Sequence, residues 1–403
     1  MGVASSRAQT RLVGLDVARF LALLGMMATH LLATRDEAGD PTWVAEVFSG
    51  RASALFALLA GVSLALMTGG SRPVRGEERV ARSAGLLVRA LAVGVVGLLL
   101  GGIDSGVAVI LVNYGVLMAL GVLVVGCSAR VLAALALLSA LLTPVLLWWA
   151  RPHLPPRGFD SPSLEGLEQP GRLVSEVLVT GYYPVLVWTA YLLAGMALGR
   201  VDLRAVRGRV LGGIALAGAV LAGAAEVVSD RLLAREGTVA LLDRDLWRLA
   251  GRDDTEALER LHRLIDTGLY GQTPTDGAWQ WLLVAAPHSS TTFDLLRTGG
   301  AAVVVVVTCV WATRSLGGWV RRAVALLSGA GAMTLTLYTL HVLMTSELLP
   351  PADDRQGAVL QAAVVVAIGA AVAATGRRGP LEGLVALAAR GTQRVVRGRP
   401  GRA

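Results

Sequence analysis

The chain has 403 residues, of which 54% are apolar and only 16% are charged, and its mean hydropathy is +0.61. Soluble domains carry about 25% charged residues, so this chain has too little charge to cover a globular surface, and its long apolar runs must face a bilayer. The net charge is +8, all the basic residues are arginines, and many of these lie in short loops between the apolar runs. The positive-inside rule explains this placement better than a nucleic-acid partner does. We therefore expect no nucleic-acid partner.

Membrane-spanning helices need about 20 mainly apolar residues. Ten segments meet this requirement, and in chain order they are 12–33, 51–69, 84–102, 106–126, 130–150, 180–199, 210–228, 297–314, 323–345 and 357–375. The sequence therefore predicts an all-α, polytopic transmembrane bundle of about ten helices, with eleven as the alternative. Asp16 and Arg19 interrupt the first apolar run, which favours an uncleaved helix over a signal peptide.

The distribution of arginines orients these helices. With a cytoplasmic N-terminus, the arginine-rich loops and the C-terminus all lie inside. We therefore expect a transmembrane domain over 1–379, an extracytoplasmic insertion at about 229–294, and a basic cytoplasmic tail over 380–403 that rests on the anionic inner leaflet.

The insertion has a pattern of its own. Residues 254–266 carry leucines at helical spacing with charges between them, which predicts an amphipathic helix. It is either a cap over a site or a simple interfacial connector. Trp279 and Trp281 follow it, as is typical of aromatic residues at a membrane interface.

Ionisable residues are rare inside a bilayer and mark sites by default, and the first helix holds three of them. Asp16 and Arg19 are three residues apart and can pair on one helical face. His30 follows Arg19 by eleven residues, which returns it to nearly the same face about 16 Å further along. One stripe then carries a cation near the inner surface and an imidazole near the outer one. The alternative is that Asp16 and Arg19 form a structural ion pair and that His30 is an interfacial histidine without a functional role.

Two further histidines lie at the same expected depth. His341 shares a polar face of the ninth segment with Thr334, Tyr338 and Thr345, and His288 precedes the eighth segment. We expect His30, His288 and His341 to converge near the outer surface, whereas His153 and His262 are interpreted as ordinary surface residues.

Polar residues near the inner surface suggest an anion site. Arg82 and Arg89 are seven apart on one face of the third segment, and with Arg19 they are suited to bind phosphates. Asn113 and Tyr114 lie in the fourth segment, where they either line a polar tunnel or hydrogen-bond neighbouring helices. The alternative for the arginines is ordinary positive-inside charge.

Several activities lack their usual motifs. The sequence has no H-E-x-x-H, no cysteines at metal-ligand spacing, no Walker A motif and no G-x-S-x-G. We therefore expect no metal. A transporter or exporter of a small molecule or lipid-linked substrate remains the alternative to an enzyme, because intramembrane charges and histidines occur in transporters too.

The opening Arg11-Leu-x-Gly-Leu-Asp16-Val-Ala-Arg19, with His30 after ten intervening residues, resembles membrane acyltransferases of the acyltransferase-3 type. The fuller pattern is similar to bacterial relatives of heparan-α-glucosaminide N-acetyltransferase. Matching stretches are Gly50-Arg51-Ala52-Ser53-Ala54-Leu55-Phe56, Ala60-Gly61-Val62-Ser63, Pro287-His288-Ser289, 334–341 and Gly379-Pro380-Leu381-Glu382.

This resemblance implies a multi-pass enzyme of the bacterial plasma membrane that moves an acyl group, expected to be acetyl, from cytoplasmic acyl-CoA to an extracytoplasmic glycan-like acceptor. Its implied partners are the lipid bilayer, acetyl-CoA and that acceptor, and a homodimer is left open. Arg19 carries over as a donor-side residue and His30 as the membrane histidine. The first outer loop has no histidine, so a covalent acetyl-histidine there is unavailable.

The residues themselves divide between the two ends of such an enzyme. Expected donor-binding residues are Asp16, Arg19, Arg82, Arg89, Asn113 and Tyr114. Expected catalytic residues are His30, His288 and His341, because a base near neutral pKa must deprotonate the acceptor. Arg51, at the outer start of the second segment, is suited to stabilise the tetrahedral oxyanion.

Overall fold

The computed structural model describes residues 12–158, 161–250, 268–269, 273–274, 277–346 and 354–398. These residues are mainly helical, and the only β-type pairing among them is an isolated bridge between Arg35 and Pro41. The all-α fold class predicted from the sequence is therefore confirmed.

Seven predicted segments are unbroken helices or helical runs long and apolar enough to cross a membrane. They contain α2 (Val13–Leu31), α4 (Arg51–Met67, preceded by α3, Trp43–Phe48), α5 (Gly76–Gly101), α7 (Ala129–Ala150), α10 (Gly208–Leu233), α13 (Thr292–Arg314) and α16 (Asp354–Ala374). Their apolar side chains remain exposed on the outside of the bundle, for example Leu91 at 69% and Val220 at 60%. Such exposure suits lipid and not water.

Three predicted segments differ from straight spans. Segment 106–126 contains only α6 (Leu111–Gly121) and the short helix η1 (Val122–Val124). Segment 180–199 begins at a break in the helix: α8 (Pro170–Ser175) and η4 (Glu176–Thr180) form one helical stretch, and α9 (Val185–Gly199) follows it at an angle of 51°. Segment 323–345 is bent by 65° between α14 (Gly318–Leu327) with η6 (Ser328–Ala332), and α15 (Thr334–Met344). The described residues thus hold seven candidate spans, or nine if each bent pair counts once, and the predicted count of ten is not confirmed.

Both bends have causes in the sequence. Pro184 has no backbone N–H to continue a helix into α9, and η4 is a π-helical turn, which shifts the residues after it relative to an α-helix. In the other pair, Gly331 packs so closely on α2 that a Cβ would overlap the Asp16 carbonyl oxygen. Helical hydropathy alone contains neither signal, which is why straight spans were expected.

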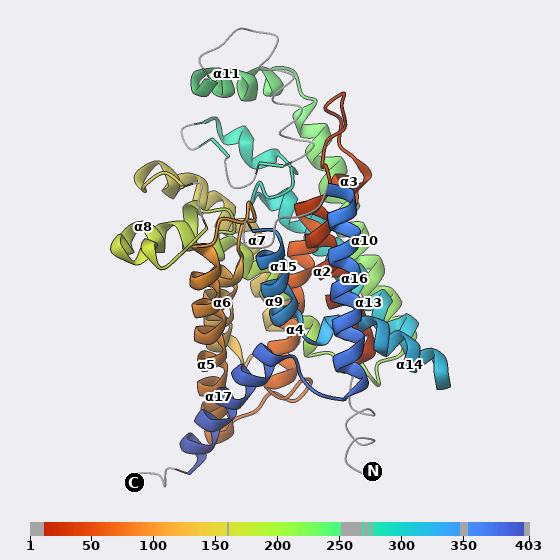
Figure 1. The fold of residues 1–403 in the computed structure, drawn as a ribbon. Helices are drawn as coiled ribbons and strands as arrows, with labels where there is room; N and C mark the ends of the chain where they lie inside the picture. Colours follow the sequence, from red (N-terminus) through yellow and green to blue (C-terminus); the bar gives the residue numbers. More distant parts are fainter. Residues whose placement is uncertain are drawn as a thin grey trace.

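Figure 1 shows the helices side by side, with α11 (Thr238–Ala250) beyond one end of the bundle and α17 (Pro380–Arg397) at the other. We call these the α11 end and the α17 end. The insertion expected at 229–294 begins after α10 ends at Leu233 and finishes before α13. The amphipathic helix predicted over 254–266 lies outside the described residues.

Within the insertion, the two tryptophans behave differently. Trp279 is 55% exposed, as expected at an interface, but Trp281 is fully buried and its indole Nε1 donates to Asp245 Oδ2 (3.1 Å). The interfacial prediction was therefore wrong for Trp281. The short helix η5 (Trp279–Leu283) turns these two side chains in different directions.

The predicted basic tail is a folded element. α17 packs along α5, and Arg397 pairs with Glu78 on that helix (2.8 Å). At its other end, the Glu382 carboxylate accepts hydrogen bonds from the backbone N–H and the hydroxyl of Thr336 (3.1 and 2.6 Å). α17 therefore fixes the start of α15, the helix that carries His341.

α4 and α9 pack backbone to backbone. Added Cβ atoms at Gly61 and Gly195 would overlap carbonyl oxygens of the facing helix, and one at Gly199 would crowd Val62. Gly195 and Gly199 are spaced four apart, the small-residue spacing by which membrane helices approach backbone to backbone.

We predict that Gly195→Ala destabilises the protein, because the new methyl group has no space beside the Leu58 carbonyl. Overpacking of this kind costs about 1–3 kcal/mol. Thermal unfolding in detergent measures the effect. Gly212→Ala on α10 is the matched control, because a Cβ there meets nothing, and it should be neutral or slightly stabilising. Equal unfolding temperatures for the two variants would contradict the prediction.

A proline ties α7 to α13. Pro144 lies inside α7 and cannot donate to the carbonyl of Ala140, four residues earlier. The hydroxyl of Thr292, at the start of α13, donates to that carbonyl instead (2.9 Å). This contact holds the turn that precedes α13, which carries His288, against the α11 end of α7.

Candidate active site

A cavity of about 150 Å³ opens between α2, α4, α5, α6 and α15 toward the α17 end. Its polar lining consists of Arg19, Ser63, Arg89, Tyr114, Thr334 and Glu382. The remaining lining is apolar, so the site combines a hydrophobic wall with two guanidinium groups. An elongated ligand with an anionic end matches this composition.

Arg19 is held from two sides. Its Nη1 lies 2.9 Å from Asp16 Oδ1, and its Nη2 donates to the Ser63 hydroxyl (2.9 Å). Asp16 is buried, whereas the Arg19 side chain is 23% exposed at the cavity. The pair predicted from the three-residue spacing is therefore present. The contact is compatible with a structural ion pair and with a donor-side role for Arg19, because the ion pair also orients the guanidinium toward the cavity.

Arg82 and Arg89 share a helix but have different surroundings. Arg82 donates to Glu78 Oε1 (2.6 Å) and to the Met67 carbonyl (2.8 Å), and it does not line the cavity. Arg89 lines the cavity and makes no hydrogen bond or ion pair with the part of the chain that the structure describes. The charges that act on it are those of Arg378 and Glu382. Within the described ranges, the donors of Arg89 therefore have no partner and are available to a ligand.

Asn113 and Tyr114 point to different places because successive helical residues are about 100° apart. Tyr114 lines the cavity, and its hydroxyl donates to the Phe56 carbonyl (3.0 Å). The Asn113 amide instead donates to the carbonyls of Val177 (3.3 Å) and Tyr183 (2.9 Å). The structure thus separates Asn113 from the other expected donor-side residues, and its observed contacts tie α6 to the bend before α9.

Toward the α11 end, three side chains form a hydrogen-bonded row. His30 Nδ1 lies 2.9 Å from His341 Nε2, and His341 Nδ1 lies 2.7 Å from Gln361 Oε1. His341 is fully buried, whereas His30 is partly exposed. The structure therefore brings two of the three predicted histidines into direct contact and adds Gln361 from α16, which sequence reasoning missed.

The row fixes which nitrogen carries each proton. The Gln361 amide donates its Nε2 hydrogen to the Met344 carbonyl (3.2 Å), so its oxygen faces His341. His341 Nδ1 must then be the donor, and in the neutral ring its Nε2 is an acceptor. His30 Nδ1–H fills that acceptor, which leaves the lone pair of His30 on Nε2. The arrangement presents His30 Nε2 as a base, with His341 and Gln361 as positioning residues.

His288 lies on a strained turn. Its φ is 56° and that of Ser290 is 60°, a left-handed conformation that non-glycine residues rarely adopt. The surroundings hold the turn: Ser290 N–H donates to Asp294 Oδ2 (3.1 Å), and the Thr273 hydroxyl donates to the Ser289 carbonyl (3.1 Å). Strain retained in this way is a feature of functional sites.

Aromatic rings surround His288. Its ring centroid lies 4.9 Å from that of Tyr182, 5.6 Å from Tyr183 and 6.3 Å from Trp188. Burial, followed by the charge of Arg157, lowers the pKa of His288 to about 4, so its ring is neutral at pH 7.

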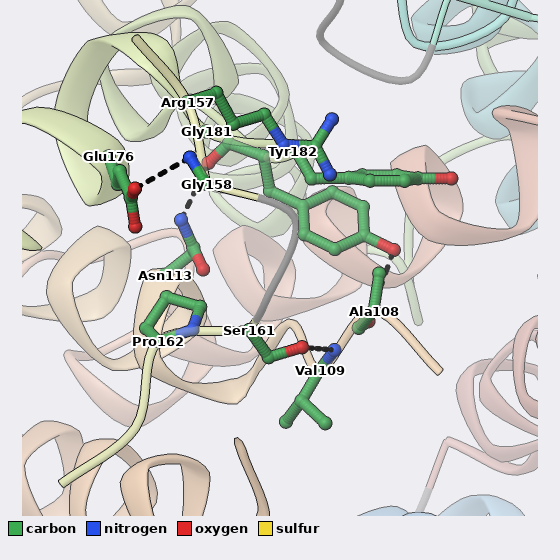
Figure 2. Close-up of a pocket in the computed structure, with 11 residues that line it drawn as sticks. Ala108, Val109, Asn113, Arg157, Gly158, Ser161, Pro162, Glu176, Gly181 and Tyr182 are labelled. Atoms are coloured by element: carbon green, nitrogen blue, oxygen red, sulfur yellow. Dashed lines mark hydrogen bonds between the residues drawn. The ribbon is translucent and has the colours of Figure 1, made fainter. Parts of the chain in front are cut away.

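Figure 2 shows a second, smaller pocket beside these rings, with a volume of about 30 Å³. The Arg157 guanidinium lies 5.0 Å from the centre of the Tyr182 ring, and the Gly158 N–H donates to Glu176 (2.8 Å). Ser161 donates to the carbonyl of Val107 and accepts from Val109 N–H (3.3 and 2.9 Å). The π-helical turn η4 places Tyr182 and Tyr183 between this pocket and His288.

Arg51 begins α4, and the preceding Gly50 packs against Pro287 and the backbone of His288. Its guanidinium donates to the Glu46 carbonyl and lies within range of the charges of Asp294, Arg297 and Glu226. Among the described residues its guanidinium makes no hydrogen bond with His30, His288 or His341. Its assignment as the oxyanion-stabilising group stays a prediction.

A scan against protein-family models matches residues 11–225 to the family described as heparan-alpha-glucosaminide N-acetyltransferase, catalytic. The match covers just over half of the chain. The chain belongs to this family. The family is one of N-acetyltransferases, and the described residues hold seven to nine candidate spans, so the chain is a multi-pass membrane protein of the acetyltransferase type. A search of curated proteins finds no match.

The heparan-alpha-glucosaminide N-acetyltransferase match contains Arg19, His30 and Arg89. It ends at residue 225, within α10, so His341 of α15 and Gln361 of α16 lie outside it. Part of the row at the α11 end is thus built by helices outside the matched region. Gln361 has one signal in the sequence, since it is a lone amide within an apolar segment. Among the described residues, no group of three or more histidine, cysteine or acidic side chains is arranged to hold a metal ion.

Proposed function

We propose that the protein transfers an acetyl group from cytoplasmic acetyl-CoA to an amine or hydroxyl of a glycan-like acceptor on the opposite side of the membrane. The α17 end faces the cytoplasm and the α11 end faces the acceptor. The observation that carries this proposal is the hydrogen-bonded row from Gln361 through His341 to His30, because it leaves one imidazole nitrogen ready to accept a proton.

The donor is proposed to enter the cavity of Arg19 and Arg89. The phosphates of acetyl-CoA cannot enter the hydrocarbon, so they stay at the mouth, where guanidinium groups pair with phosphate oxygens. The apolar lining accommodates the extended arm that carries the thioester. Because α2 carries both Arg19 and His30, about 16 Å apart along its axis, the thioester reaches His30 only with the arm directed along α2.

At the α11 end, His30 Nε2 takes the proton of the acceptor as its nitrogen or oxygen attacks the thioester carbonyl carbon. The carbon–sulfur bond of the tetrahedral intermediate then breaks, and the imidazolium returns the proton to the CoA thiolate. His341 Nε2 accepts the hydrogen of His30 Nδ1 and so stabilises the positive His30 ring, and Gln361 holds His341 in the required tautomer. The aromatic rings around His288 offer apolar faces against which a sugar ring packs.

A direct test uses the purified protein in sealed vesicles, sorted by which end of the bundle faces out. Labelled acetyl-CoA is added on one side and glucosamine, as the acceptor probe, is enclosed on the other. We expect labelled acetyl-glucosamine only when the α17 end faces the donor. Binding of acetyl-CoA is measured in parallel. Absence of binding would overturn the proposal, and binding without transfer would restrict the error to the acceptor.

We predict that Gln361→Leu lowers the transfer rate about 10–100-fold. The row then loses a hydrogen bond that supports a charged imidazole, and such bonds contribute about 1.5–3 kcal/mol. Gln361→Glu keeps an acceptor oxygen and should retain most of the activity. Equal loss in both variants would contradict the role of the Gln361 oxygen as the acceptor for His341.

A further inference from the structure

An apolar groove of about 720 Å³ lies between α2, α3 and α16, and the mechanism above does not use it. Its walls include Met27 and Leu31 of α2, Phe48 of α3, and Ala358 and Ala362 of α16. Ligand-binding cavities in proteins have volumes of about 300–1,000 Å³, so the groove has room for a substantial part of a ligand.

Packing of the three helices holds the groove in shape. α3 and α16 both pack against α2. Gly25 on α2 makes room for the Phe48 ring, because a Cβ at residue 25 would overlap that ring. Phe48 in turn meets the Trp43 ring edge-on, with 6.1 Å between the ring centroids. The α3 wall is therefore fixed against α2.

The depth of the groove follows from its α2 wall. That wall runs from Leu24 to Leu31, the last residue of α2, which is about 10 Å along the helix axis. Trp43 at the rim is 62% exposed, as is typical of a tryptophan at a membrane interface. The groove thus lies in the leaflet at the α11 end, where its apolar walls suit a hydrocarbon chain.

Two polar residues complete the lining. The Thr42 hydroxyl is occupied, because it donates to the Ala33 carbonyl (2.7 Å). Arg355, in the first turn of α16, is exposed and makes no hydrogen bond or ion pair with another described residue. Guanidinium groups bind phosphate oxygens. A hydrocarbon chain that ends in a phosphate therefore complements the groove in both polarity and charge.

The groove and the histidine row share two helices. His30 directly precedes Leu31 on α2, and Gln361 directly precedes Ala362 on α16. Both structures therefore lie at the same level of the bundle. A ligand whose chain occupies the groove has its head group at the last turn of α2, which is the turn that carries His30.

We propose that the acceptor is a saccharide joined through a phosphate to a hydrocarbon chain, and that the groove binds this chain. Arg355 binds the phosphate, and the saccharide reaches His30 around the end of α2. This inference rests on the proposed function, because it names the class of acceptor for that reaction. The chain holds the saccharide at the membrane surface, where a free sugar has only its own polar contacts.

A binding test uses the purified full chain in phosphatidylcholine nanodiscs. The probe is glucosamine 1-phosphate esterified with decanol, with a photoreactive diazirine in the decyl chain. After irradiation, peptide mass spectrometry should find label on α2, α3 and α16. Excess unlabelled ester should remove this label, and excess phosphatidylglycerol should not. Ala358→Trp fills part of the groove and should reduce the labelling about tenfold.

A transfer test uses labelled acetyl-CoA and the same nanodiscs. Ala358→Trp should raise the ratio of the KM for the ester to the KM for glucosamine about tenfold, because only the ester has a chain. Arg355→Gln should raise the ratio of the KM for the ester to the KM for decyl glucosaminide about tenfold, because only the ester has a phosphate. Ala134→Trp is the control, since Ala134 is exposed on α7, and it should leave both ratios unchanged. Partitioning of each acceptor into the bilayer is the same for every variant.

Label that phosphatidylglycerol displaces as well as the ester does would make the groove a site for ordinary lipids and overturn the proposal. An unchanged KM ratio in Ala358→Trp would overturn it too. If Ala358→Trp does not fold, an unchanged ratio in Arg355→Gln has the same meaning. Specific labelling without transfer to any acceptor would contradict the proposed reaction and leave the groove ligand supported. Transfer to glucosamine without specific labelling would support the reaction and overturn the groove ligand.

Discussion

His30→Ala is expected to abolish acetyl transfer while acetyl-CoA binding remains close to that of the wild type. The row of His30, His341 and Gln361 presents His30 Nε2 as the proton acceptor, and general base catalysis contributes about 10²–10⁴-fold to a rate. Donor binding should persist because Arg19 and Arg89 lie toward the other end of the bundle. Single-turnover transfer with labelled donor, together with equilibrium binding, measures both effects.

His153→Ala is the control for this variant, since His153 packs against Trp149 at the end of α7 and takes no part in the row. It should transfer at the wild-type rate. Label retained on the protein without acceptor would indicate a covalent relay through His30. Wild-type transfer by His30→Ala would exclude His30 as the base and direct attention to His288.

Arg89→Gln should weaken acetyl-CoA binding about tenfold to a hundredfold. Arg89 lines the donor cavity without a partner among the described residues, and loss of a charge-assisted hydrogen bond costs about 1.5–3 kcal/mol. Arg19→Ala should produce a loss of similar size. Isothermal titration with acetyl-CoA and with CoA provides the measurement.

Arg82→Gln is the control for Arg89→Gln, because both arginines lie on the same face of α5 and both are replaced by glutamine. The Arg82 guanidinium is already occupied by Glu78 and the Met67 carbonyl, so its removal should change donor affinity much less. A larger loss for Arg82→Gln than for Arg89→Gln would place the phosphates nearer to Glu78, outside the cavity.

Helix position and spacing along one helix were readable from the sequence, because hydropathy and the 100° rotation per residue are local properties. They predicted seven of the spans and the contact between Asp16 and Arg19. Segments 180–199 and 323–345 were expected to be straight because their bends depend on a π-helical turn and on close packing of Gly331 against α2. Neither feature changes the hydropathy of the segment.

The site was predictable only in part, because contacts between helices are set by tertiary packing. A shared depth correctly suggested that His30 and His341 approach each other. It did not reveal Gln361, whose importance depends on its distance to His341. Asn113 and Arg82 were grouped with the donor-side residues by depth as well, and the structure gives each of them other partners.

Because Gly61, Gly195 and Gly199 leave no space between the backbones of α4 and α9, these two helices move as one body. α4 carries Ser63, the partner of Arg19, and α9 carries Trp188 beside His288. The separation between the two ends is therefore set by rigid helices. Under the proposed function, this fixed separation sets the length that a donor must span. A donor with a shortened arm would not reach His30, so the enzyme selects donors by the length of the arm that carries the acyl group.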